Sequence, residues 1–324
     1  MRLVLLPTVA VALSISLSAQ QDHAASSAQS PVFRSEASMV ALNVTVLDGH
    51  KLVSGLSRDD FEIYEDGVQQ RVNFFESRSV PMDIILLLDT SSSMGDKMEI
   101  VHRAARGFMK MLRPEDRGAV VSFANSVSIV QPLSSDVKAI EAAIEGTTAH
   151  GSTSLHNAIY VALKEFGRAA QSAGDVRRQA IAVLSDGEDT ASLISFDDVM
   201  ALARKSGVNI YTIGLQSQSA QSRAKSEIGK FLSEADYSLK SLAQETGAQW
   251  FFPKNVNELK GVYDNIAGEL SAQYSIGYSP SNTRPDGRFR RIMIRVATNP
   301  AFRPRARAGY TADPPARRGV FQHP

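Results

Sequence analysis

The sequence predicts an α/β fold, with a mostly parallel central sheet covered by helices on both faces and a β region on each side of it along the chain. Two apolar runs without polar alternation, residues 84–88 and 180–184, are typical of strands buried on both faces. Between residues 83 and 271 helical periodicity alternates with strand-like runs, which indicates βαβ connections. Outside that stretch apolar residues recur at every second position, which indicates half-buried β segments.

The N-terminal flank, residues 32–78, is predicted to be a β segment. Apolar residues alternate with polar or small ones from Val40 to Val46, and Phe61 and Ile63 begin a second strand of the same kind. Asp66-Gly67 is a hairpin signal, so residues 68–74 should continue on the far side of a turn. We interpret the acidic residues at 59–60 and 65–66 as parts of solvated turns.

Residues 79–272 are predicted to form the α/β domain. Core-facing apolar stripes predict helices at 96–112, 136–145, 154–166, 196–206, 239–246 and 255–271. Asp96 and Glu99 are spaced as the N-cap and the third residue of the first helix, and Gly207 should end the fourth. Further strands are predicted at 118–123, 127–133, 209–215 and 249–252, with a polar excursion at 216–226.

The C-terminal flank, residues 273–312, returns to strand-like alternation at 274–278 and 292–296, around a turn at 285–287. From Arg284 onward the chain has ten Arg and two Asp, and Arg303, Arg305 and Arg307 should share one strand face. We interpret this Arg-rich stretch as a solvated β face rather than as a patch that binds a polyanion. The Pro-rich residues 313–324 are predicted to be a disordered tail.

The two β flanks are expected to form one small accessory module. Strands of a parallel sheet all run toward one edge, so the first strand begins, and the last connecting helix ends, at the opposite edge. Each flank has too few strands to be stable alone, and pairing the two buries both apolar faces and hides strand edges. We therefore expect this module on the side away from the strand ends where a ligand would bind.

A change of chemistry follows the first buried strand, in Met82 to Met94, MDIILLLDTSSSM. Asp89, Ser91 and Ser93 occupy alternate positions, so their side chains can converge. Hard oxygens with one carboxylate suit a hard divalent cation such as Mg²⁺. The same hydroxyls could instead cap the helix that follows, and this stretch alone leaves both interpretations open.

Two later stretches complete a pattern, Thr153 in HGSTSLHNAI and Asp186 in IAVLSDGED. With Asp89, Ser91 and Ser93 they resemble the von Willebrand factor type A (VWA) domain and its metal-ion-dependent adhesion site, over about residues 80–272. The flanks also resemble a secreted bacterial VWA-related family. The resemblance implies a Rossmann-like fold and one divalent cation held by these five residues. In the family the Ser hydroxyls bind the ion directly, while the Thr and the second Asp exchange between direct and water-mediated contact.

The composition of this ligand shell predicts a binding function. Two carboxylates and several neutral hydroxyls leave a dication with an exchangeable position, which an Asp or Glu of a partner protein could occupy. We therefore expect a cation-dependent, adhesion-type protein-binding module that is not an enzyme. Mg²⁺ is the expected ion, with Mn²⁺ or Ca²⁺ as alternatives.

Two other functions remain as alternatives. The first is a structural VWA domain without metal, and the second is a metal-dependent phosphoesterase. The Asp-x-Ser-x-Ser loop superficially resembles the aspartyl-phosphate loop of the haloacid dehalogenase type, but that family needs a second Asp where this chain has Ser91. A Gly-x-Ser-x-Gly nucleophile motif does not occur in the sequence either.

Several residues near the pattern depart from the family or have uncertain roles. Ser152 stands where the family often has Gly, and Asn157 where Asp is common. Neither is a proposed ligand, so these departures bear on loop geometry. The acidic residues 188–189 could bind metal waters, but we expect them to face solvent. His150 and His156 lack partners for a zinc site and are predicted to be exposed loop residues.

The first 19 residues are predicted to be a cleaved secretory signal peptide, followed by a flexible leader at 20–31. Arg2 precedes an apolar run, and small residues end it at Ser18-Ala19. The chain has no Cys, which excludes a lipoprotein anchor, disulfides and thiol metal sites. Removing Arg2 lowers the basic count from 35 to 34, equal to the 34 acidic residues. A net charge of zero predicts neither a nucleic-acid nor a membrane partner. From the signal peptide and the absence of a lipid anchor we expect a secreted or periplasmic protein.

Overall fold

A computed structural model describes residues 39–77, 80–172, 177–186, 188–215 and 233–312. The predicted signal peptide, leader, polar excursion and C-terminal tail lie outside these residues. Among the described residues, no helix combines the length and the apolar character that crossing a membrane requires.

The α/β domain is built on a six-stranded sheet with the order β11-β10-β9-β6-β7-β8. The strands are β6 (Met82–Asp89), β7 (Arg117–Phe123), β8 (Val127–Ser134), β9 (Arg178–Ser185), β10 (Asn209–Gly214) and β11 (Trp250–Phe251). All neighbours pair in parallel except β7 and β8, which are antiparallel. Because β6 and β9 lie in the middle, every residue of β6 after Met82 is buried, as the apolar run predicts.

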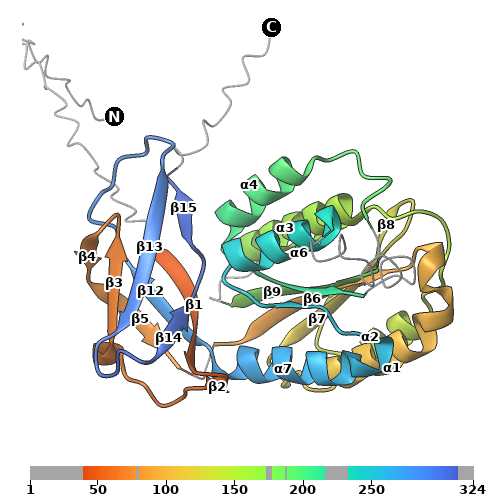
Figure 1. Ribbon diagram of the computed structural model, residues 1–324, viewed down its shortest axis with the longest axis horizontal. Coiled ribbons are helices and arrows are strands. Elements are labelled where there is room, and N and C mark those ends of the chain that lie inside the picture. Colours follow the sequence, from red (N-terminus) through yellow and green to blue (C-terminus); the bar gives the residue numbers. More distant parts are fainter. Residues whose placement is uncertain (1–38, 78–79, 173–176, 187, 216–232, 313–324) are drawn as a thin grey trace, which may run out of the picture. The chain divides into compact units, whose positions relative to one another are not determined.

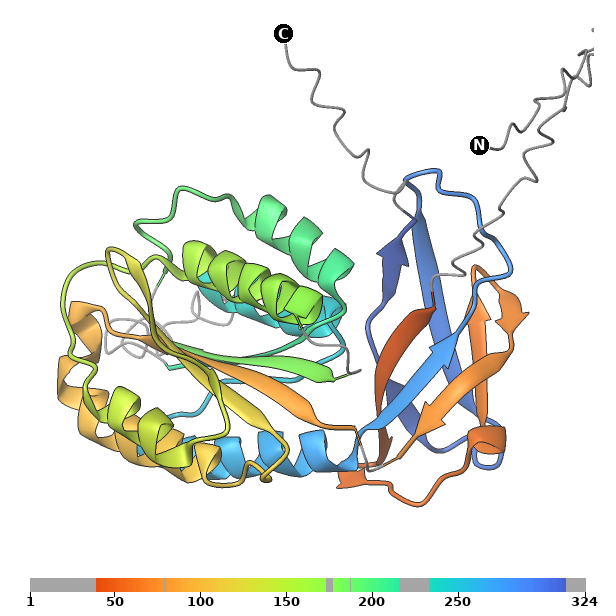
Figure 2. The same cartoon turned by 180° about the vertical axis from the view of Figure 1, so that it is seen from behind.

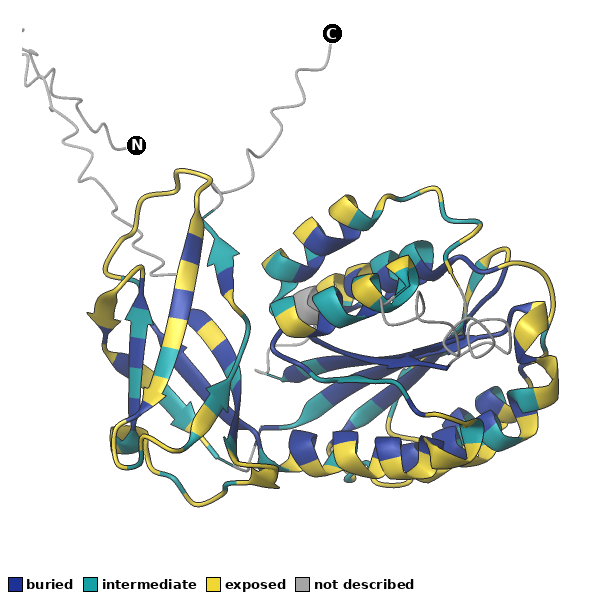
Figure 3. Ribbon diagram, in the orientation of Figure 1, coloured by how far each residue is buried: buried dark blue, intermediate teal, exposed yellow. Residues whose placement is uncertain are grey.

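Among the described residues, helices cover both faces of this sheet (Figure 1). On one face lie α1 (Met98–Met109), α2 (Val137–Glu145) and α7 (Leu259–Ala272), and on the other α3 (Leu155–Ser172), α4 (Phe196–Ser206) and α6 (Glu234–Glu245). Each layer has its own apolar core, and Figure 3 shows the sheet buried between helices that expose their outer sides. The predicted α/β architecture is confirmed.

The start of the first helix differs from the prediction. A 3-10 segment, η2 (Ser92–Lys97), precedes α1, and Lys97 rather than Asp96 occupies the N-cap position. Asp96 is therefore not the cap, because the chain first makes a tighter turn after β6. A second short 3-10 segment, η4 (Val256–Glu258), likewise precedes α7. In both places the apolar stripe in the sequence extends beyond the regular α-helix, because a 3-10 turn places apolar residues at nearly the same spacing as an α-helical turn.

The flanking strands form one β module with two antiparallel sheets (Figure 2). One sheet has the order β14-β1-β12-β5, with β2 on β1, and the other has the order β15-β13-β3-β4. Their bounds are β1 (Val40–Asp48), β2 (Lys51–Leu52), β3 (Phe61–Glu65), β4 (Val68–Gln70), β5 (Val72–Glu76), β12 (Tyr274–Tyr278), β13 (Phe289–Val296), β14 (Arg303–Arg305) and β15 (Gly309–Thr311). Each sheet contains strands from both flanks, and the two sheets share one apolar core, so the module built from both flanks is confirmed.

The hairpin in this module has the predicted turn but a different continuation. Asp66 and Gly67 both have positive φ, 48° and 84°, as a two-residue turn between β3 and β4 requires. Residues 68–74, however, do not continue as one strand. The chain breaks at Arg71, so β4 stays beside β3 while β5 pairs with β12 in the other sheet. A short η1 (Arg58–Asp60) precedes β3.

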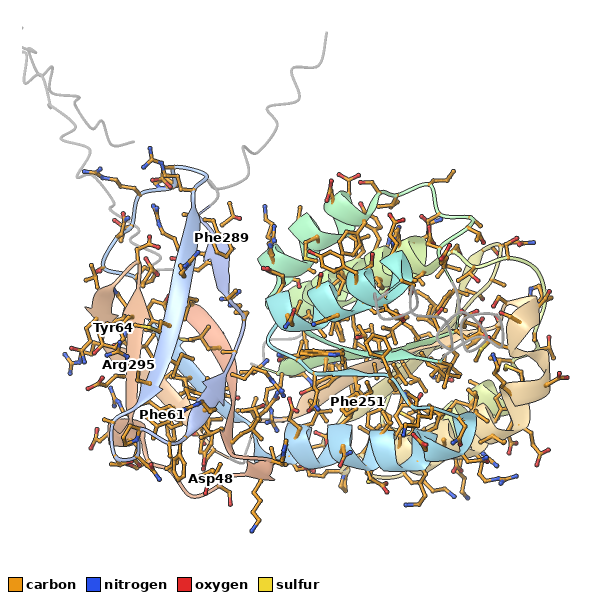
Figure 4. The ribbon with its side chains drawn as sticks, viewed as in Figure 1. Asp48, Phe61, Tyr64, Phe251, Phe289 and Arg295 are labelled. Carbon is orange, nitrogen blue, oxygen red and sulfur yellow. The ribbon has the colours of Figure 1, made fainter. Side chains whose placement is uncertain are left out.

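The outer face of the β3–β13 pair carries polar and aromatic side chains. Tyr64 and Arg295 project from neighbouring strands, and the Arg295 guanidinium lies 5.4 Å from the centre of the Tyr64 ring (Figure 4). Phe61 begins β3 and belongs to the apolar core of the module. This alternation explains why the two-residue period was visible in the sequence.

The hydrogen bonds between the β module and the α/β domain lie at the amino ends of the parallel strands. Asn43 of β1 donates to Asn209, the first residue of β10, at 2.8 Å. Thr45 of β1 donates to Glu269, near the end of α7, at 3.2 Å. These contacts are at the edge of the sheet opposite Asp89, as the directional argument predicts.

Candidate metal centre

Asp89 is the last residue of β6 and is fully buried. Its Oδ1 accepts a hydrogen bond from the Ser91 backbone N–H at 2.8 Å, and its Oδ2 accepts one from the Ser185 hydroxyl at 2.6 Å. Burial raises the pKa of the Asp89 carboxyl above its usual range, and the hydrogen bonds from Ser185 and Ser91 act against that rise. Both carboxylate oxygens are thus oriented by neighbours on β9 and on the loop that follows β6.

Three further predicted residues are linked in one chain of contacts. The hydroxyls of Ser91 and Ser93 lie 3.0 Å apart, and Ser93 donates to Asp186 Oδ1 at 2.7 Å. Asp186 follows β9 directly, so it reaches the loop after β6 from the neighbouring parallel strand. The structure therefore brings Asp89, Ser91, Ser93 and Asp186 together, because the carboxyl ends of β6 and β9 are adjacent.

Thr153, the fifth predicted residue, lies on a loop that is hydrogen-bonded to the loop after β6. The backbone N–H of Ser92 donates to Gly151 at 3.0 Å, and that of His150 donates to Thr90 at 2.7 Å. Thr153 itself is buried, and its carbonyl accepts from the N–H groups of residues 190 and 191 at 2.9 and 3.0 Å. Backbone contacts thus join the loop of Thr153 to the loops that carry the other four residues.

One acidic residue after Asp186 and one nearby histidine are less exposed than expected. Asp189 does not simply face solvent, since only 15% of its side chain is exposed and it lies 3.4 Å from the ring nitrogen of His156. His156 is on α3 and partly buried, not on an exposed loop. Glu188 and His150 are exposed, as expected. The prediction fails for Asp189 and His156 because both hold the segment after Asp186 against α3.

The comparison with known families is decisive for the fold. The family model of the von Willebrand factor type A domain matches residues 83–265. The chain belongs to this family. VWA domains are generally interaction modules rather than enzymes, commonly of the adhesion type, and they often bind a divalent cation at the adhesion site.

Individual proteins resemble parts of the chain. An uncharacterized protein of Borreliella burgdorferi is 30% identical over 165 residues, which are 47% of this chain and 46% of that protein. This chain therefore spans less than half of that relative's length. Among solved structures, the VWA domain of the type V pili tip protein Mfa5 of Porphyromonas gingivalis is 14% identical, with a TM-score of 0.47 over 59% of this chain and 95% of that one. The mussel byssus proximal thread matrix protein 1, with a zinc-occupied adhesion site, is 19% identical, with a TM-score of 0.48 over 64% and 49%.

Three residues of this VWA domain contribute to the candidate site although the sequence analysis did not select them. Ser185 orients Asp89, and Asn125 accepts a hydrogen bond from the Ser152 N–H at 2.6 Å. Lys97 pairs its ammonium with Asp186 Oδ2. Ser185 and Asn125 each follow a predicted strand on the same sheet edge, so their position could have identified them. Lys97 had no such signal, because a predicted helix at 96–112 made it look like an ordinary solvated position.

The interpretation of the Arg-rich C-terminal stretch as a solvated face holds for only part of the stretch. The exposed Arg residues are Arg284, Arg288, Arg291, Arg295 and Arg303, whereas Arg290 is buried and Arg305 and Arg307 are half-buried. Arg305 pairs with the buried carboxylate of Glu269 and donates to the Gly247 carbonyl at 3.2 Å. Burial lowers the pKa of the Arg307 guanidinium, which lies over the Tyr310 ring. Arg305 and Arg307 are therefore parts of the packed structure, because the chain leaves β14 at residue 305 and turns toward α6 and α7.

Proposed function

We propose that this VWA domain is a secreted, divalent-cation-dependent protein-binding module, in which Asp89, Ser91, Ser93, Thr153 and Asp186 hold the ion. The observation that carries the proposal is the continuous chain of contacts from Asp89 to Asp186 at the carboxyl edge of the sheet. Secretion follows from the predicted signal peptide, and membership of the secreted bacterial VWA-related group stays a prediction.

The chemistry of the oxygens supports a hard ion. The Ser91 and Ser93 hydroxyls form a hydrogen-bonded pair 3.0 Å apart, so both oxygens can face one cation. Hard oxygen ligands suit Mg²⁺, with Mn²⁺ or Ca²⁺ as alternatives. Within the described part of the chain, no three His, Asp or Glu side chains cluster as metal ligands, so the candidate shell relies on hydroxyls beside its two carboxylates. Such a shell suits an ion that takes its last ligand from a partner's Asp or Glu.

The ion-binding half of the proposal is tested by titrating the purified chain with Mg²⁺ in a calorimeter. Asp89→Asn keeps an acceptor for the Ser91 N–H but removes the charge, so we expect Mg²⁺ binding to be lost. Glu188→Gln is the matched control, because Glu188 is an exposed carboxylate that lies only two residues after Asp186. Equal affinity for Mg²⁺ in the wild type and Asp89→Asn would remove Asp89 from the site.

The partner-binding half is tested by affinity capture from the native extracellular fraction. We expect proteins captured with Mg²⁺ to be released by a chelator and not to be captured by Asp89→Asn. Purified protein with Mg²⁺ or Mn²⁺ should not hydrolyse phosphate esters or peptides. A metal-dependent turnover that Asp89→Asn abolishes would favour the phosphoesterase instead.

One observation favours a second candidate, the structural VWA domain without metal. Lys97 supplies a positive charge to Asp186 from within the chain, so that carboxylate has a counter-charge without an ion. Absence of Mg²⁺, Mn²⁺ and Ca²⁺ binding to the wild type, with a stable fold, would decide for this candidate.

A further inference from the structure

Leu193 is the most exposed large apolar side chain among the described residues, with an exposed fraction of 96%. Tyr237 and Val68 follow with 62% and 57%. Leu193 lies between β9 and α4, on the segment that follows Asp186. A single exposed apolar residue is ordinary on a protein surface. Leu193 is distinguished by the way in which its backbone is held.

The backbone around Leu193 is fixed by a side chain of α3. The Oδ1 atom of Asn157 accepts hydrogen bonds from the N–H groups of Leu193 and Ile194, both at 3.2 Å. The Asn157 N–H in turn donates to the Ser192 hydroxyl at 3.0 Å, and that hydroxyl donates to Asp189 at 2.7 Å. The segment is therefore already ordered with the Leu193 side chain in solvent. A partner that covered it would gain apolar burial at a small cost in conformational entropy.

The same segment places Leu193 close to the candidate ion site. The N–H of Ala191 lies 3.0 Å from the carbonyl of Thr153. Two further residues of chain reach at most about 7 Å, so the Leu193 backbone lies within about 10 Å of the Thr153 carbonyl. An extended peptide rises about 3.3 Å per residue, so a stretch of at most three residues covers this distance.

We propose that Leu193 is an apolar anchor for the partner segment whose carboxylate reaches the ion. The inference rests on the proposed function and narrows the partner to one chemistry. That partner presents an extended segment with an Asp or Glu and a large apolar side chain at most three positions apart. The carboxylate supplies the ion-dependent contact, and the apolar side chain packs on Leu193 and excludes water there.

The test is selection of a random peptide library displayed on phage against the full chain in Mg²⁺, with elution by a chelator. Parallel selections use Leu193→Ser and Val68→Ser. Val68 is the control because it is an exposed apolar residue on β4, in the β module. Neither side chain is buried, so both variants should fold, and circular dichroism checks this.

We expect the wild type and Val68→Ser to enrich peptides with an acid and an apolar residue at the stated spacing. Leu193→Ser should still enrich peptides with an acid but should lose the preference for an apolar residue. It should bind the peptides enriched on the wild type about tenfold more weakly. Enrichment of an acid alone, or the same apolar preference on Leu193→Ser, would overturn the anchor and leave the proposed function standing. If the chelator eluted no acidic peptides from the wild type, both the anchor and the proposed function would be overturned.

Discussion

Lys97 and Asp186 form an ion pair inside the candidate metal centre. The Lys97 ammonium contacts Oδ2 of Asp186, while the Ser93 hydroxyl donates to Oδ1 of the same carboxylate at 2.7 Å. The Asp186 side chain is fully buried, and the Lys97 side chain is 23% exposed. A buried carboxylate needs a counter-charge, and here the chain provides one beside the predicted ion position.

Removing the Lys97 charge should strengthen ion binding. In Lys97→Met a cation no longer competes for Asp186, and the carboxylate left without its partner destabilises the chain until an ion neutralises it. We expect Mg²⁺ to bind about tenfold more tightly, a change of about 1.4 kcal/mol. Calorimetric titration measures the affinity, and thermal unfolding with and without Mg²⁺ measures the linked stability.

The control for Lys97→Met is Lys110→Met. Lys110 immediately follows α1, and its exposed side chain pairs with Glu141 on α2. Its replacement should change neither the Mg²⁺ affinity nor the response of the unfolding temperature to Mg²⁺. Unchanged or weaker Mg²⁺ binding in Lys97→Met would show that the ammonium does not compete with the ion.

Much of the fold could be predicted because its signals are periodic. The buried run of β6 and the two-residue period of β1 and β13 report burial directly. The break at Arg71 could not be predicted, because β4 and β5 carry one continuous apolar pattern and only pairing partners distinguish their sheets. The 3-10 turn before α1 was hidden for a similar reason, since three- and four-residue spacings overlap within one turn.

The candidate site was predictable only in part. Asp89, Ser91 and Ser93 stand out because polar residues directly follow a buried strand. The contribution of Lys97 depends on the distance between two separate loops, which a linear pattern does not carry. Arg305 was misinterpreted for the same reason, because its partner Glu269 lies on α7, in another part of the sequence.

Glu269 should be essential to the attachment of the β module to the VWA domain. Its buried carboxylate accepts hydrogen bonds from Tyr211 at 2.8 Å and Thr45 at 3.2 Å, and it pairs with Arg305. Glu269→Ala removes the acceptor for the Tyr211 and Thr45 hydroxyls and the counter-charge of Arg305, so we expect a loss of about 3–5 kcal/mol in the free energy of unfolding. Urea unfolding measures this loss.

The matched control on the same helix is Asp264→Ala. Asp264 is exposed and pairs with Lys260 one turn earlier, a contact expected to contribute less than about 0.5 kcal/mol. Equal stability of Glu269→Ala and Asp264→Ala would mean that the contact between the β module and α7 does not depend on this carboxylate.

Tyr278 should make the chain less stable at alkaline pH. Burial, together with its hydrogen bond to Glu65 at 2.7 Å, raises the pKa of the Tyr278 phenol, and the same causes raise that of Tyr310. An unfolded phenol loses its proton near pH 10, while the folded one keeps it. Above about pH 10 the unfolded state therefore binds fewer protons than the folded one. The contribution of each such phenol to the free energy of unfolding is constant below about pH 10 and falls above it by about 1.4 kcal/mol per pH unit.

In Tyr278→Phe the free energy of unfolding should fall less steeply above pH 10, by the contribution of one proton, in urea titrations between pH 8 and 11.5. Tyr237→Phe, which alters an exposed side chain on α6, should follow the wild-type curve. If Tyr278→Phe followed the wild-type curve as well, the phenol of Tyr278 would not be the group that couples unfolding to pH.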